Sequence, residues 1–155
     1  MSQYWICDTC GEKIENPKDG WIEWIVVRNG EERTGRDLRL VHHMPASPLG
    51  KPQGCQFDGK AEFSKDRGIV ADLSLEYFLS SNGLMRMLVF LSENELPKEN
   101  VLEMIKRLFI PGYEVARHHF DQAIDEGVFE PNMPENYYLI DDIKATLKFL
   151  EREGE

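Results

Sequence analysis

The side chains best suited to chemistry in this sequence are its three cysteines, which all lie in the N-terminal part of the chain. Cys7 and Cys10 are separated by two residues, and Cys55 follows much later. Two thiolates at this spacing converge on one metal ion, and a glycine such as Gly11 lets backbone amides turn toward the sulfurs. Since three cysteines cannot pair completely as disulfides, the sequence predicts a metal site.

A tetrahedral site needs a fourth ligand, and the pair His42 and His43 can supply it. The spacing is Cys-x2-Cys-x31-His-x12-Cys if His42 binds, or x32 and x11 if His43 binds. Adjacent residues of a regular strand point to opposite faces, so we expect only one of the two to bind. A closed site of this kind favours structural Zn²⁺, whose binding energy helps to fold a segment with few core residues.

Residues 4–11, Tyr-Trp-Ile-Cys-Asp-Thr-Cys-Gly, resemble the zinc knuckle of rubredoxin-like and zinc-ribbon proteins. The resemblance covers these eight residues only and implies a metal-binding turn. Those families usually supply a second Cys-x2-Cys pair, which is replaced here by a histidine and Cys55. Rubredoxin iron takes four thiolates, so this departure favours zinc over iron.

A second resemblance supports an alternative interpretation of the histidine pair. The segment Val-His-His-Met-Pro at residues 41–45 is similar to the opening of the His-Asn-His nuclease motif. In that family one histidine activates water and the other helps to hold the catalytic metal, and an Asn and a further His or Asn follow on a helix. This chain offers Asn82 and no matching final histidine. The resemblance implies a metal-dependent nuclease.

The charge distribution bears on nucleic-acid binding. The chain of 155 residues has a formal net charge of −10, which disfavours a protein that coats nucleic acid through cationic surface. Residues 1–70 carry 10 basic and 11 acidic side chains, whereas residues 71–155 carry 8 and 17. The basic side chains of the first part allow a local nucleic-acid contact as a further alternative; among them are Arg28, Arg33, Arg36, Arg39, Lys51, Lys60, Lys65 and Arg67.

The elements that must position the cysteines and histidines follow from the pattern of residues 20–70. Residues 21–28 are dense in β-branched and aromatic side chains, and Asn29-Gly30 then favours a reversal into a second strand over residues 37–43. Three prolines and two glycines predict a loop over residues 45–54, long enough to bring Cys55 back to the metal. We expect short strands near residues 55–57 and 61–63.

Residues 71–155 show helical spacing. Asp72 is placed to cap a first helix, and residues 84–92 are apolar nearly all round, which predicts the buried centre of a bundle. Further apolar stripes predict helices over residues 97–109, where Pro97 suits the first helical position, 113–124 and 140–150.

The sequence therefore predicts an α+β protein in which an N-terminal zinc-stabilised antiparallel β module, residues 1–70, precedes an acidic C-terminal bundle of about five helices, residues 71–155. The two are expected to pack together, because no flexible linker separates them. No nucleophile, general acid or general base stands apart from the metal ligands Cys7, Cys10, Cys55 and the histidine pair. We expect a cytoplasmic, non-enzymatic interaction or regulatory protein that binds another protein, without contact to a membrane.

Overall fold

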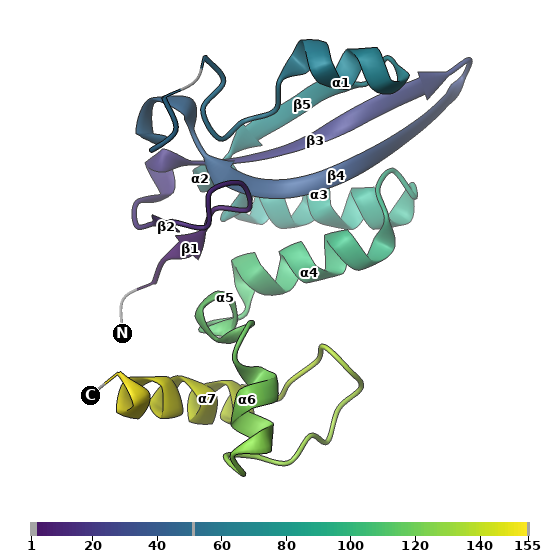
Figure 1. The fold of residues 1–155 in the computed structure, drawn as a ribbon. Helices are drawn as coiled ribbons and strands as arrows, with labels where there is room; N and C mark the ends of the chain where they lie inside the picture. Colours follow the sequence, from purple (N-terminus) through teal and green to yellow (C-terminus); the bar gives the residue numbers. More distant parts are fainter. Residues whose placement is uncertain (1–2, 51, 155) are drawn as a thin grey trace. The chain divides into compact units, whose positions relative to one another are not determined.

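The computed structural model describes residues 3–50 and 52–154 (Figure 1). Antiparallel strands in the N-terminal part and helices in the C-terminal part confirm the α+β class. Tyr4–Phe109 form one compact unit, and Ile110–Glu155 make up most of a second. The change of composition near residues 68–72 falls inside the first unit, at a strand of its sheet.

The first unit is built on a three-stranded antiparallel sheet in the order β4-β3-β5. Its strands are β3 (Gly20–Asn29), β4 (Glu32–His42) and β5 (Ile69–Ser74). The predicted reversal at Asn29-Gly30 is confirmed, and Gly30 takes the left-handed φ of 66° that a tight turn requires. In the register of this hairpin Gly20 lies opposite His42, so β4 ends at the histidine pair.

Helices cover both faces of this sheet (Figure 1). On one face lie α2 (Leu75–Phe78), α3 (Ser81–Ser92) and α4 (Lys98–Phe109). Trp24 points to this face and meets the rings of Phe78 and Phe90 edge-on, at centroid distances of 6.0 Å and 5.1 Å. On the other face lies α1 (Gly59–Asp66). The largest core of the molecule therefore lies between the sheet and α2–α4.

A small hairpin precedes the sheet and carries the first two cysteines. Its strands β1 (Trp5–Ile6) and β2 (Lys13–Ile14) pair antiparallel, and Cys7 and Cys10 lie in the turn between them. Short 3-10 helices follow at Pro17–Asp19 and Met44–Ala46.

Three expected elements near the join of strands and helices are wrong. The strand expected at residues 61–63 lies within α1, because the Asp58 carboxylate accepts hydrogen bonds from the Lys60 and Ala61 N–H groups and starts a helix. Residues expected to begin a helix after Asp72 instead complete β5, which pairs with β3. The hydroxyl of Ser74, rather than Asp72, caps the helix that follows. The segment at residues 55–57, where a strand was expected, forms a turn and bend outside the sheets.

The helix predicted over residues 84–92 is present as α3, but it is not the buried centre of a bundle. Met85 is 62% exposed, and Leu88 and Val89 are also exposed. The helix lies at the surface because it covers one face of the sheet with one stripe only, which includes the buried Met87 and Phe90.

The second unit contains α5 (Tyr113–Ala116), α6 (Phe120–Asp125) and α7 (Ile140–Glu153). The final predicted helix is confirmed, whereas the helix predicted over residues 113–124 is interrupted between α5 and α6. The small core of this unit centres on Phe120, whose ring stacks on Tyr138 at 3.7 Å. None of the described helices is long and apolar enough to cross a bilayer.

Candidate metal centre

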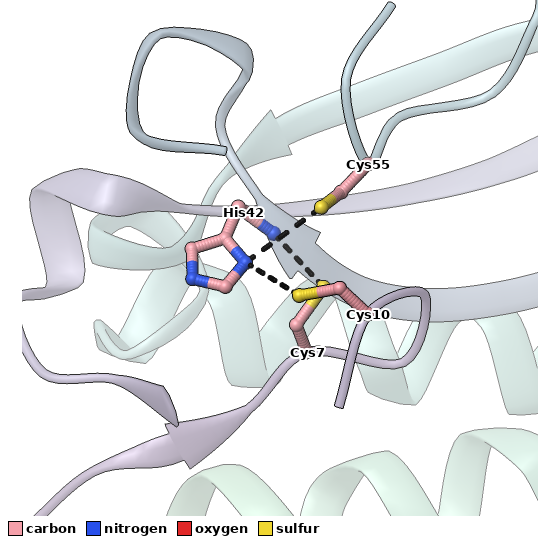
Figure 2. Close-up of side chains that lie close together, drawn as sticks. All are labelled: Cys7, Cys10, His42 and Cys55. Carbon is pink, nitrogen blue, oxygen red and sulfur yellow. Dashed lines mark hydrogen bonds between the residues drawn. The ribbon is translucent and has the colours of Figure 1, made fainter. Parts of the chain in front are cut away.

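The three cysteines and one histidine meet at a single point beside the end of β4. The Sγ atoms of Cys7, Cys10 and Cys55 and a ring nitrogen of His42 all lie within 4.8 Å of one another. Figure 2 shows the four side chains directed toward one another from three separate segments of the chain. Cys7, His42 and Cys55 are buried, and Cys10 is half-buried. The arrangement can hold a metal ion.

The turn between β1 and β2 presents the first two thiols. The N–H of Cys7 donates to the carbonyl of Glu12 and the N–H of Gly11 donates to the carbonyl of Cys7, both at 3.0 Å. Gly11 takes a left-handed φ of 78°, which a side chain would disfavour. This tight turn explains the Cys-x2-Cys-Gly sequence, because it brings two residues three positions apart to the same ion.

The strand separates the two histidines, as alternation requires. The Nδ1 atom of His42 lies 3.4 Å from the Cys10 Sγ and 3.8 Å from the Cys55 Sγ. The Nε2 atom lies 3.1 Å from the carbonyl oxygen of Lys13, so an Nε2–H tautomer donates there and leaves the Nδ1 lone pair facing the sulfurs. His43 instead stacks its ring on Trp21 at 4.7 Å. The structure thus brings His42 to the cysteines and His43 to an aromatic ring.

The loop that follows β4 returns Cys55 to the site, as its length predicted. The Ser47 hydroxyl lies 2.9 Å from the Cys55 Sγ. The Cys55 carbonyl accepts a hydrogen bond from the Thr9 hydroxyl at 2.7 Å and another from the Arg39 guanidinium at 3.1 Å. The thiol therefore has a fixed position even though it comes from a loop.

A buried carboxylate anchors this loop to the sheet. Glu23 on β3 is fully buried and accepts hydrogen bonds from the N–H of Phe57 at 2.9 Å and 3.1 Å and from Arg39 at 3.3 Å. Burial raises the pKa of the Glu23 carboxyl, although the Phe57 N–H and the Arg39 charge oppose the shift. Glu23 and Arg39, which are paired across β3 and β4, together hold the segment around Cys55 through the Phe57 N–H and the Cys55 carbonyl.

A second anchor joins the metal-binding turn to α4. Asp8, between the two cysteines, accepts hydrogen bonds at 2.8 Å from the N–H of Leu40 and from the buried guanidinium of Arg107. Arg107 also donates to the carbonyl of Ile6 at 3.0 Å. Helix α4 thereby supports the turn in addition to packing against the sheet.

The thiols differ in acidity. Burial acts to raise the pKa of Cys7, but hydrogen bonds from backbone N–H groups, those of Cys10 and His42 first, outweigh it and lower the pKa to about 7. Burial raises the pKa of Cys10 to about 11, and repulsion from the neighbouring Cys7 adds to the shift. Deprotonation of a second thiol beside Cys7 is therefore unfavourable unless a cation neutralises the charge, and a metal ion satisfies that condition.

Within residues 3–50 and 52–154, no other group of His, Cys, Asp or Glu side chains is placed to hold a metal ion. No family model, curated protein or solved structure matches this chain. What the site can do must be argued from its geometry and its donor atoms.

The remaining residues singled out in the sequence lie elsewhere. Asn82, the counterpart of the nuclease asparagine, lines a surface hollow on α3 together with Tyr77 and Met85. Arg36 and Arg39 serve the fold: Arg36 pairs with Asp37, Glu62 and Asp66, and Arg39 pairs with Glu23.

The supports of the site were missed by sequence reasoning. Nothing in the sequence pairs Arg107 with Asp8, because the two are 99 positions apart and neither belongs to a motif. Asp8 did carry a signal in its place between the two cysteines, where a short acceptor can reach the adjacent strand.

Proposed function

We propose that this chain is a zinc protein whose Cys3His site is structural. The observation that carries the proposal is the convergence of three Sγ atoms and the His42 Nδ1. Zn–S bonds of about 2.3 Å and a Zn–N bond of about 2.0 Å in a tetrahedron separate sulfur from nitrogen by about 3.5 Å. The distances of 3.4 Å and 3.8 Å from Nδ1 to the sulfurs of Cys10 and Cys55 agree with that value.

The donor set supports zinc over other metals and a structural over a catalytic role. Thiolates with one imidazole suit Zn²⁺, whereas rubredoxin-type iron takes four thiolates and Mg²⁺ or Ca²⁺ takes oxygen. Four protein ligands fill a tetrahedron and leave no position for water or substrate. The reduced cysteines fit a cytoplasmic protein.

We further propose that the role of the protein is non-enzymatic, as an interaction or regulatory protein that binds another protein. The support is the closed ligand set together with the burial of Cys7, His42 and Cys55, which leaves the surface of the unit as the part available for function. In this role zinc fixes the shape of a surface rather than taking part in a reaction.

The zinc assignment is tested by metal analysis and thiol titration of the purified full-length chain. We expect one zinc per chain and three thiols that react only after a chelator is added. Replacement by Co²⁺ should give the intense thiolate charge-transfer and visible bands of a tetrahedral site. Protein without bound zinc, whose three thiols titrate freely, would contradict the proposal.

The non-enzymatic role is tested separately with a nuclease assay. We expect supercoiled plasmid to remain intact in the presence of Mg²⁺, Mn²⁺ or Zn²⁺. Metal-dependent nicking that disappears in a His43→Ala variant would overturn the non-enzymatic role and favour the nuclease reading. The zinc assignment would stand in that case, because His43 lies outside the ligand cluster.

A further inference from the structure

The two outer edges of the sheet differ. At β4 the turn that carries Cys7 and Cys10 pairs with the edge at Leu40: the Asp8 N–H donates to the Leu40 carbonyl, and the Leu40 N–H donates to the Asp8 carboxylate. At β5 the edge is open. Among the described residues, no backbone hydrogen bond joins Ile69–Leu73 to anything but β3. Unpaired strand edges are templates for a further strand.

On one side of the sheet, a hollow beside the start of the open edge is lined by unpaired arginines. Arg28 and Arg33 lie directly opposite each other on β3 and β4, a like-charge pair that disfavours the hairpin unless an anion compensates it. With Arg67 they surround a hollow of about 430 Å³ whose floor includes Ile69 and Ala71. None of the three guanidinium groups forms an ion pair with a described residue, in contrast to Arg36 with its three carboxylates.

The other side of the same edge is lined by apolar side chains. Phe63 on α1 is 47% exposed and Ile69 is 59% exposed, and both border a second hollow, together with Lys60 and Val70. Because successive side chains of a strand point to opposite faces, an added strand would send alternate side chains toward the arginines and toward Phe63.

We propose that the edge of β5 binds an extended segment of a partner protein in which acidic and aliphatic residues alternate. Main-chain hydrogen bonds to residues 69–73 would supply affinity, and the two hollows would supply specificity, as in other cases of strand addition. The acidic side chains meet Arg28, Arg33 and Arg67, and the aliphatic ones meet Phe63. The inference rests on the proposed protein-binding role and is independent of the identity of the metal.

Charge and composition favour this occupant over two others. A second copy of β5 would bring only one carboxylate, Asp72, to the three arginines. A single-stranded nucleic acid binds where aromatic rings stack on its bases, and none of the residues that line the arginine hollow is aromatic. A short acidic peptide also meets less repulsion than a long polyanion from a protein with a net charge of −10.

The test uses the zinc-loaded full chain and a capped, fluorescent peptide of about ten alternating Glu and Val residues, enough to span β5. We expect saturable binding by anisotropy, with amide shift changes in the NMR spectrum confined to the two hollows and β5. A peptide with Lys in place of Glu, and one with alternate backbone amides methylated, should each bind at least about tenfold more weakly. These controls change only the peptide, so they do not depend on the folding of a protein variant.

Matched protein variants locate the site. Arg28→Glu with Arg67→Glu should weaken binding by at least about tenfold, whereas Lys98→Glu, a single charge reversal at the exposed start of α4, should leave it unchanged. The proposal would be overturned if the methylated peptide bound equally well, or if the NMR shift changes lay away from β5. It would also be overturned if the protein self-associated and lost this association in the arginine variant, or if oligothymidylate bound more tightly at the same residues. Zinc content measured on the same sample separates these outcomes from a failure of the zinc assignment.

Discussion

His42 and His43 carry the same side chain at adjacent positions, yet they have different surroundings. Residue 42 closes the β4 ladder opposite Gly20, and its ring is held by the Lys13 carbonyl so that Nδ1 faces three sulfurs. Residue 43 points away and stacks on Trp21. At the residue scale, strand alternation explains why only one of the two is placed to bind metal.

This pair provides a matched test of the site. Loss of a residue that hydrogen-bonds to a metal ligand typically lowers metal affinity by about 10- to 100-fold. His42→Ala should lower zinc affinity by more than this, because it removes a ligand itself. His43→Ala should retain one zinc per chain. Competition with a chromogenic chelator measures both affinities. Equal zinc affinity in the two variants would contradict the ligand assignment.

Arg107 is the more deeply buried of the two arginines that support the site, with a side chain only 4% exposed against 23% for Arg39. Its removal would take one donor from the Ile6 carbonyl and one from the Asp8 Oδ2, which keeps its hydrogen bond from the Leu40 N–H. Hydrogen bonds to a charged group contribute more to stability than those between neutral groups.

We therefore expect Arg107→Met to lower the free energy of unfolding by about 2 kcal/mol, the loss of the hydrogen bonds that a buried charged group makes. Lys98→Met, which removes an exposed charge from the same helix, should change it by less than about 0.5 kcal/mol. Urea unfolding of the zinc-loaded protein measures both. If the two variants unfold alike, Arg107 does not support the metal-binding turn.

At the scale of elements, Arg36 joins α1 to the hairpin. It lies on β4 and forms ion pairs at 2.9 Å with Glu62 and Asp66 of α1. Hydrogen bonds from Arg36 hold the pKa of Asp66 below its usual value. Burial acts to raise the pKa of Glu62, but hydrogen bonds from Arg36 and Lys65 outweigh it, so that this pKa is also lowered.

These lowered pKa values predict how stability depends on pH. A carboxyl whose pKa is lower in the folded state stabilises the fold above its unfolded pKa, and this contribution is lost as the pH falls through the folded pKa. Arg36→Gln should therefore destabilise the protein at pH 7, and the difference from wild type should shrink as the pH falls below about 4. Urea unfolding at a series of pH values measures it, and because acid release of zinc affects both proteins, the difference isolates the ion pairs. A difference independent of pH would refute this role of Arg36.

At the scale of the whole molecule, charge and tryptophan residues are distributed unevenly between the two compact units. Residues 110–155 carry 11 acidic and 4 basic side chains, a net charge of −7 out of the total of −10. The three tryptophans of the chain, by contrast, all lie at positions 5–24 in the unit that contains the metal centre. Tryptophan fluorescence therefore reports on that unit alone.

Chelation of zinc should destabilise the first unit and leave the second folded. Removal of zinc should lower the free energy of unfolding of Tyr4–Phe109 by at least about 4 kcal/mol, the stabilisation that a ligand provides at about 1,000 times its Kd. Tryptophan emission should shift to the red. NMR signals from the core of the second unit, such as those of Phe120 and Ile143, should persist, and added zinc should restore the emission. Tryptophan emission unchanged by a strong chelator, or loss of both sets of signals together, would contradict the prediction.

Local sequence patterns predicted secondary structure correctly where the residues of a segment determine its conformation by themselves. The hairpin around Asn29-Gly30 and the helix predicted over residues 97–109 follow from periodicity and turn residues, and both are confirmed, the helix as Lys98–Phe109. Sequence patterns gave wrong predictions where the structure of a segment depends on another segment that packs or pairs with it. Leu73 continues a strand because its backbone pairs with β3. The apolar α3 lies at the surface because only one of its faces meets the sheet.

The sequence by itself determined which atoms could bind a metal, because residue type and short spacing set donor chemistry and the geometry of a turn. Only the tertiary structure decided that His42 rather than His43 lies among the sulfurs, and that Arg107 supports a turn 99 positions away. It also separated Arg36 and Arg39, which have carboxylate partners, from Arg28, Arg33 and Arg67, which line an open strand edge. The physical reason is that ion pairs and strand edges depend on which segments meet in space, and that information is not contained in any local stretch of the chain.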